Sequence, residues 1–193
     1  MSSVRSRASY GNTAQKLWAD KRVRIAVNLL LITVFSALTA LAKNMHPSVG
    51  IPGSSAIFWL TAMITGRSVV KMEFAGLLIG CGTAAWGIPI GLEHTFGYNV
   101  LLYGASGLLL DAMTKIPKIS LDNLFGAALC GLTAHMAKYG FIVYAAVATS
   151  VSKHFIIVGF VKSAAFHAAF GIAAGLIAWG IVKASRLGIK RLT

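Results

Sequence analysis

Six apolar runs separated by short polar breaks constrain the fold of this chain more than any other feature of its sequence. Each run has, or nearly has, the roughly 20 residues that an α-helix needs to cross the hydrocarbon core of a bilayer. The runs cover residues 25–42, 51–66, 72–92, 97–113, 124–150 and 159–184. Strands of a membrane β-barrel would alternate apolar and polar residues over about ten positions, and the runs show no such alternation. We therefore predict an all-α membrane protein with six transmembrane helices.

The composition supports this class. Charged residues make up 12 % of the chain, whereas a soluble domain has about a quarter. A net charge of +13 would suggest a nucleic-acid partner in a soluble protein. The sequence lacks a basic and aromatic patch of the type that binds nucleic acid, so we expect no such partner. The two cysteines both fall within apolar runs and do not form a disulfide framework.

The placement of the basic residues predicts the orientation of the helices. Fourteen of the 18 Lys and Arg residues precede the first run, follow the last one, or lie in the loops after the second and fourth runs. Cytoplasmic loops are enriched in Lys and Arg, so both termini are expected in the cytoplasm, with anionic lipids attracted to the basic side. The predicted organisation is a basic segment over 1–24, a six-helix domain over 25–184 and a basic tail over 185–193.

Several polar and aromatic residues fall at membrane depth in the outer half of the predicted helices. His135, Lys138 and Tyr139 share one face of the fifth helix by their spacing. His167 lies in the outer half of the sixth helix, and Trp86 lies toward the outer end of the third. Snorkelling of the lysine and hydrogen bonds between helices would explain each residue singly. Their common depth favours a solute cavity instead.

The outer loops carry further polar residues that could contact a solute. They are His46, Ser48, Glu93 and His94.

The two cysteines have different explanations. Cys130 continues a stripe of small residues from Gly126, so helix packing accounts for it. Cys81 lies about 100° around its helix from the stripe that contains Gly80, and packing does not require it there. A thiolate is a soft ligand that suits a polarisable metal centre. Cys81 is therefore a candidate metal ligand, with inert packing as the alternative.

Motifs for several kinds of catalysis and energy coupling are missing. The sequence has no Walker motif, no His-Glu-x-x-His pair and no Gly-x-Ser-x-Gly elbow. It also lacks the twofold repeat of interrupted helices that many secondary transporters show. A pump and an ordinary hydrolase are therefore not expected.

The segments 47–55 (PSVGIPGSS) and 80–89 (GCGTAAWGIP), within the six-run pattern, resemble a known family. The chain is similar over essentially its whole length to the substrate-binding S-components of energy-coupling factor transporters, and most similar to the cobalamin-specific BtuM-type proteins. The resemblance implies a six-helix S-component bundle in the inner membrane of a bacterium that takes up cobalamin from the periplasmic side as its transported ligand.

The resemblance also implies roles for particular residues. Cys81 matches the cysteine whose sulfur coordinates the cobalt of the bound corrinoid, and Trp86, His135, Tyr139 and His167 become candidates for the lining of the cavity. A thiolate on cobalt competes with cyanide, so loss of cyanide from cyanocobalamin is a chemical corollary that would make Cys81 a catalytic residue as well.

The expected partners and the alternatives follow from the same resemblance. S-components usually dock on a shared coupling module through an Ala-x-x-x-Ala pair on the first helix, where this chain has Ser36 and Ala40. Docking is thus in doubt, and solitary operation fits the BtuM-type group. Two alternatives stay open: a membrane enzyme that removes axial ligands from corrinoids, and an S-component for another vitamin with an inert Cys81.

Overall fold

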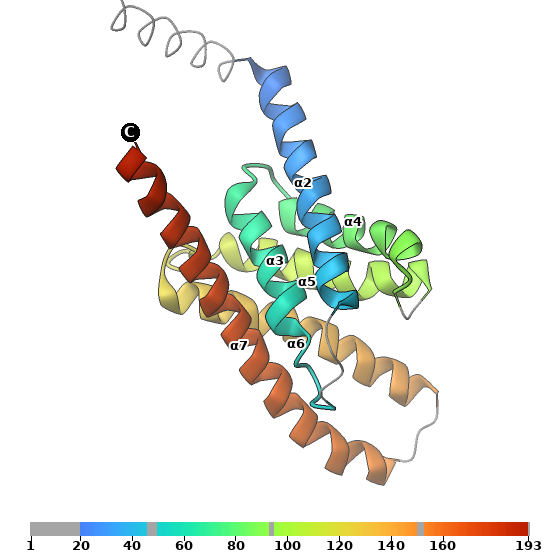
Figure 1. The fold of residues 1–193 in the computed structure, drawn as a ribbon. Coiled ribbons are helices and arrows are strands. Elements are labelled where there is room, and N and C mark those ends of the chain that lie inside the picture. The colour runs from blue at the N-terminus through green and yellow to red at the C-terminus, as the bar shows by residue number, and fades with distance from the viewer. Residues whose placement is uncertain (1–19, 46–49, 93–94, 150–152, 193) are drawn as a thin grey trace, which may run out of the picture.

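The chain forms six α-helices in the part that the structure describes. The computed structural model describes residues 20–45, 50–92, 95–149 and 153–192, and these residues contain no β-strand (Figure 1). The helices are α2 (Lys21–Asn44), α3 (Ala56–Val69), α4 (Ala75–Ile90), α5 (Phe96–Thr114), α6 (Leu124–Ala148) and α7 (Lys153–Leu192). The prediction of an all-helical protein is confirmed, and each helix overlaps one of the six apolar runs.

Local sequence signals set the ends of these helices. The Asp20 carboxylate accepts a hydrogen bond from the backbone N–H of Arg22 at 2.8 Å and caps the start of α2. Helix α3 begins later than its apolar run because Pro52 and Gly53, the latter with φ +80°, form a turn before it. Gly91, with φ +79°, ends α4 and donates its N–H to the carbonyl of Gly87.

Consecutive helices pair as three hairpins, α2–α3, α4–α5 and α6–α7, and α3 contacts the other five helices (Figure 1). Glycines allow the backbones in two of the hairpins to touch. A Cβ atom added to Gly131 of α6 would lie 2.2 Å from the carbonyl oxygen of Gly171 of α7. A Cβ atom added to Gly80 of α4 would lie 2.2 Å from the carbonyl oxygen of Tyr103 of α5. The small-residue stripes therefore act as helix contacts, as their four-residue spacing predicted.

Two helices are long and apolar enough to cross a bilayer. They are α2 and the part of α7 over Gly159–Gly188, and only 22 % and 33 % of their most apolar windows are buried inside the protein. Helices α3 and α4 are apolar but have 14 and 16 residues. Length and composition are weak evidence by themselves, since a core helix or a signal sequence has the same properties. Six crossings and the location of the termini stay predictions.

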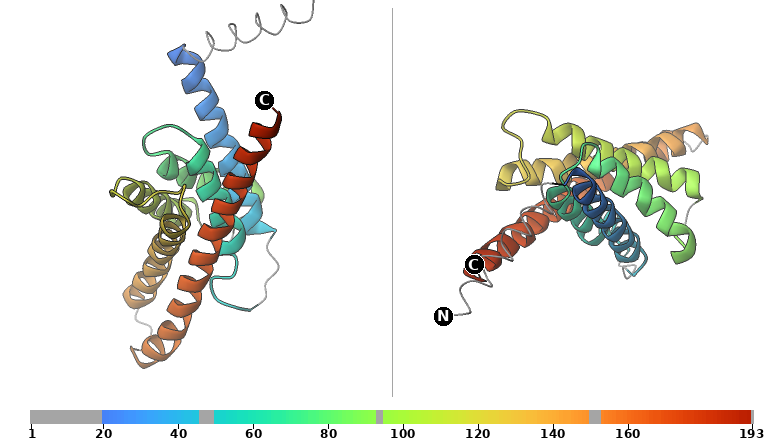
Figure 2. Two further views of the ribbon diagram at one scale, coloured as in Figure 1. Left: turned by 90° about the vertical axis from the view of Figure 1, so that its left-hand side faces the viewer. Right: turned by 90° about the horizontal axis from the view of Figure 1, so that it is seen from above.

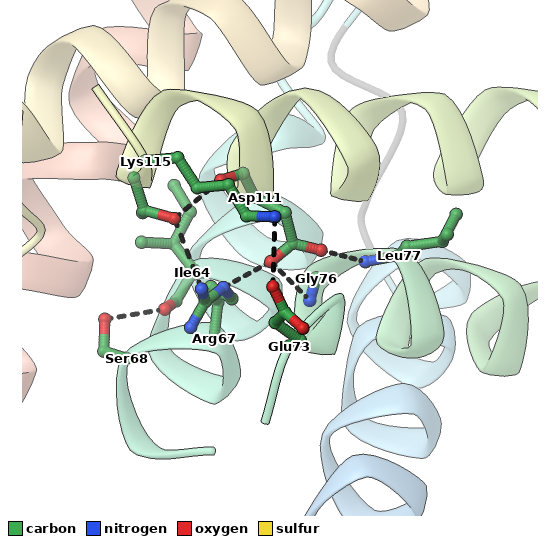
Figure 3. Close-up of polar contacts among 9 residues, drawn as sticks. Ile64, Arg67, Ser68, Glu73, Gly76, Leu77, Asp111 and Lys115 are labelled. Atoms are coloured by element: carbon green, nitrogen blue, oxygen red, sulfur yellow. Dashed lines mark hydrogen bonds and ion pairs between the residues drawn. The ribbon is translucent and has the colours of Figure 1, made fainter. Parts of the chain in front are cut away.

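A buried ion pair joins α3, α4 and α5. Asp111 of α5 is 1 % exposed and pairs with Arg67 of α3 (Figure 3). The same carboxylate accepts hydrogen bonds from the backbone N–H groups of Gly76 and Leu77, at 3.1 and 2.9 Å, in the first turn of α4. Arg67 also donates to the hydroxyl of Thr114 at 3.2 Å. We call Asp111, Arg67 and these partners the Asp111 centre. Its carboxylate neutralises the guanidinium and caps α4, so it fixes three helices at one point.

Helix α7 extends past the body of the protein at its carboxyl end (Figure 2). Arg186 pairs with Asp122 at 2.7 Å, and the indole Nε1 of Trp179 donates to the carbonyl of Asp122 at 3.0 Å. These contacts tie α7 to the segment before α6. The segment 185–193, predicted as a basic tail, therefore continues α7 as helix through Leu192.

Candidate functional site

Six polar and aromatic side chains from four helices meet inside the protein. We call them the histidine–lysine cluster. Its members are Trp59 on α3, Tyr103 on α5, His135, Lys138 and Tyr139 on α6, and His167 on α7. Each is at most 7 % exposed. Asp122, which pairs with Arg186 of α7, lies just before α6. The three cluster members on α6 follow Gly131 and so lie further along the helix from that ion pair.

The packing of α6 on α7 brings the two histidines together. The buried face of α6 consists of small residues up to Ala134. His135, Lys138 and Tyr139 continue the same face and are also buried. Because the backbones touch at Gly131 and Gly171, the His135 and His167 rings stack with centroids 4.7 Å apart and planes at 20°.

Hydrogen bonds hold Tyr139 and His167 against the backbone of α7. Nδ1 of His167 lies 2.9 Å from the carbonyl oxygen of Ser163, one turn earlier on α7. The ring of His167 also lies 4.7 Å from the ring of Tyr139. The Tyr139 hydroxyl donates to the carbonyl of Phe160 at 2.6 Å, which joins α6 to α7 again. These bonds fix the two rings against α7.

The lysine of the cluster is held between two aromatic rings. Lys138 Nζ lies 4.6 Å from the ring centroid of Trp59 and 4.6 Å from that of Tyr103, and 3.5 Å from the Tyr103 hydroxyl. The Trp59 and Tyr103 rings meet edge to face with centroids 5.2 Å apart. Cation–π contacts of this kind stabilise a charged group most strongly where water is excluded. The amine of Lys138 is therefore enclosed inside the protein between aromatic rings of α3 and α5.

Three polar atoms of the cluster, on His135 and Trp59, form no hydrogen bond of good geometry within the described part of the chain. Both ring nitrogens of His135 and the indole Nε1 of Trp59 make no hydrogen bond of good geometry among the described residues, although these side chains are 1 % and 0 % exposed. The backbone of Gly53 approaches the His135 ring without forming such a bond. A buried polar group without a partner costs about 1–3 kcal/mol, and proteins keep such groups mainly where they serve a purpose. His135 and Trp59 are therefore available to hydrogen-bond a solute.

The segment before α3 packs against the two histidines. A Cβ atom at Gly53 would lie 3.1 Å from His135 Nε2 and 3.1 Å from His167 Nδ1. Only a glycine fits this close approach with φ +80°. Gly53, which belongs to the segment that suggested the family, thus packs directly against both histidine rings.

The predicted site residues fall into two groups. His135, Tyr139 and His167 come together in the histidine–lysine cluster, whereas Cys81 and Trp86 lie on α4. Trp86 is 40 % exposed. A Cβ atom at Gly104 of α5 would lie 3.5 Å from Cys81 Sγ, so the sulfur lies in the contact between α4 and α5.

Trp59 and Tyr103 were missed by the sequence analysis. Both are aromatic residues within apolar runs, where they are indistinguishable from ordinary core residues. The residues His46, Ser48, Glu93 and His94 lie outside the described residues, as does the 47–49 part of the family motif.

The described residues contain no group of three or more His, Cys, Asp or Glu side chains that could hold a bare metal ion. Cys130 is fully buried in the hydrophobic core, in agreement with its predicted packing role. The cluster offers aromatic faces, the amine of Lys138 and hydrogen-bonding atoms of His135 and Trp59.

Comparisons of the chain with protein-family models, with curated proteins and with solved structures returned no match. The resemblance to S-components therefore stays a prediction from the sequence.

Proposed function

We propose that this protein is a six-span inner-membrane transporter of the S-component type that captures an organic solute at the histidine–lysine cluster. The observation that carries the proposal is His135, a fully enclosed imidazole with two unpartnered ring nitrogens beside a buried lysine. A solute with donor and acceptor groups would satisfy these atoms, and its apolar part would lie against the aromatic rings.

Exposed apolar surface supports a location in the membrane. Leu30 is 63 % exposed, Phe125 74 % and Val161 71 %. These large apolar side chains lie on α2, α6 and α7, and lipid tails would cover them in a membrane.

The grouping of the basic residues supports the orientation. Lys21, Arg24 and Lys71 line one cavity, and Lys71 together with Arg67 and Arg186 lines a second. The basic ends of α2, α3 and α7 thus lie near one another, as they would on the cytoplasmic side. The histidine–lysine cluster and Gly53 would then lie toward the outer side.

Cobalamin is the solute that the family resemblance implies, and it needs a cobalt ligand. Cys81 is partly exposed, and its sulfur faces Gly104 of α5, so it can serve only if the corrin ring reaches the contact between α4 and α5. Imidazole nitrogen also binds late first-row metals, so His135 is a second candidate ligand within the cluster. The two ligands can be told apart by mutation.

The position of Cys81 favours one alternative among those left open. An inert cysteine is expected to place its sulfur in a contact between helices, as Cys81 of α4 does beside Gly104 of α5. In that case the protein carries another vitamin-like solute at the same cluster, with no cobalt bond.

The test mixes purified protein with cyanocobalamin, removes the free ligand and measures the absorbance spectrum and the corrinoid-to-protein ratio. Cobalamin transport predicts one corrinoid per protein and a shifted spectrum for the wild type. Loss of both in Cys81→Ala assigns the cobalt to sulfur, and loss in His135→Leu alone assigns it to the cluster. A wild-type protein that retains no corrinoid would exclude cobalamin and leave the alternative solute.

Transport is tested separately from binding and from removal of the axial ligand. A cobalamin-dependent strain that lacks its own importer should grow on low cobalamin when it expresses this chain. Conversion of cyanocobalamin by the purified protein without growth of the strain would favour the membrane enzyme.

A further inference from the structure

A cavity of about 560 Å³ lies where α2 begins and where α3 leads into α4. This volume is within the range of small-molecule sites in proteins. Its wall combines basic, amide and apolar side chains. The lining residues are Lys21, Arg24, Ile25, Val27, Asn28, Leu31, Val69, Lys71 and Met72.

The charged and apolar parts of the wall are separated along α2. Lys21 and Arg24 belong to its first turn, Ile25 follows directly, and Leu31 lies about two turns after Arg24. The side chain of Asn28 accepts a hydrogen bond from the backbone N–H of Lys71 at 3.1 Å, which fixes the α3–α4 connection against α2 and places Lys71 beside the second turn of that helix. Basic residues therefore line the cavity along the first two turns of α2, and its apolar wall continues to Leu31.

Among the described residues, no acidic side chain lines this cavity. The carboxylate of Asp20 caps α2, and Glu73 pairs with Lys115 at 3.3 Å. The two other cavities at this end differ, because Asp122 lines both and forms an ion pair with Arg186. The cavity beside α2 is thus the one of the three whose basic side chains have no carboxylate within the wall.

We propose that this cavity binds a single anionic phospholipid, with the phosphate at Lys21, Arg24 and Lys71 and an acyl chain along Ile25 and Leu31. A lone phosphate would use the charges and leave the apolar wall in water, whereas a phospholipid matches both parts. Basic cavities between membrane helices on the cytoplasmic side bind such headgroups. This inference rests on the proposed membrane location and orientation and is independent of the solute.

The experiment measures lipid retention by native mass spectrometry after transfer from mixed phosphatidylglycerol and phosphatidylcholine vesicles into detergent. We expect the wild type to retain one phosphatidylglycerol in preference to phosphatidylcholine. Each of the three charges should contribute about fivefold to that preference. The triple variant Lys21→Gln, Arg24→Gln, Lys71→Gln should lose on the order of 100-fold.

The matched control removes equal charge from the same end of the protein, with Arg22→Gln, Lys118→Gln and Lys183→Gln, which lie outside the cavity. It should keep the preference of the wild type. Equal loss in both triple variants, or equal retention of both lipids by the wild type, would overturn the proposal. If the triple variant fails to fold by helicity and gel filtration, Lys71→Gln alone should lose about fivefold.

The lipid result and the solute result are read independently. Retention of phosphatidylglycerol without any bound corrinoid would support the lipid site and leave the transport proposal to its own test. Binding of a solute without a preference for phosphatidylglycerol would support the solute site and overturn the lipid site.

Discussion

The protein contains two buried polar groups that differ in how well they are satisfied. At the Asp111 centre the carboxylate pairs with Arg67 and accepts two backbone N–H groups. At the histidine–lysine cluster, the ring nitrogens of His135 and the indole of Trp59 have no partner among the described residues. Both groups are enclosed by the helices, so burial alone does not explain the difference.

The contrast separates a structural role from a binding role. A satisfied network in a low-dielectric interior fixes the helices that contribute to it. An unsatisfied one costs free energy that a ligand can recover on binding. The Asp111 centre therefore holds α3, α4 and α5 together, whereas the histidine–lysine cluster is the site at which we propose that a solute binds.

The largest effect is expected at the Asp111 centre. Asp111→Ala leaves the guanidinium of Arg67 without its partner and should lower the free energy of unfolding by about 3–5 kcal/mol. The measurement is unfolding in detergent followed by circular dichroism. Glu73→Gln removes the exposed ion pair to Lys115 and should cost less than about 1 kcal/mol. Equal effects of the two changes would remove the structural role of the centre.

A medium effect is expected where α6 touches α7. Gly131→Ala places a methyl group 2.2 Å from the carbonyl oxygen of Gly171 and should destabilise the protein by about 1–3 kcal/mol. It should also weaken solute binding, because it moves His135 relative to His167. Gly140→Ala on the same helix faces open space and should be neutral or stabilising by up to about 1 kcal/mol. Thermal unfolding of the pair decides whether the backbone contact positions the cluster.

The smallest change in stability is expected at the cluster itself. His135→Leu removes two unpartnered ring nitrogens, so the free energy of unfolding should stay constant or rise by about 1 kcal/mol. The same detergent unfolding series measures it. A loss comparable to that of Asp111→Ala would show that His135 is a structural residue with satisfied contacts, and the contrast between the two regions would fail.

The sequence predicted the helices better than their ends. Apolar periodicity and length located all six, because burial in lipid or protein demands continuous apolar segments. The sequence predicted that the second helix begins at residue 51, whereas the turn at Pro52 and Gly53 delays the start of α3 to Ala56. The sequence predicted that the sixth helix ends at residue 184, but α7 continues to Leu192, and Arg186 in this extension pairs with Asp122.

The candidate site was predicted in part. The spacing on one helix face brought His135 and Tyr139 together with Lys138, and helix depth added His167. Trp59 and Tyr103 depend on contacts between helices distant in sequence, which periodicity does not encode. The environment of Cys81 depends on Gly104 in the same way, so its role as a cobalt ligand stays a prediction.

Analysis of small molecules carried by the purified protein tests whether the histidine–lysine cluster holds a solute. The protein is purified from cells grown with vitamins, denatured, and its released small molecules are quantified by mass spectrometry against those of His135→Leu and of Phe125→Leu, a change at an exposed position on the same helix outside the cluster. We expect one compound near stoichiometric amount in the wild type and in Phe125→Leu, reduced at least about tenfold in His135→Leu, as for loss of one or two hydrogen bonds in a buried site. A bound compound present at equal levels in all three proteins would contradict the assignment of the solute to this cluster.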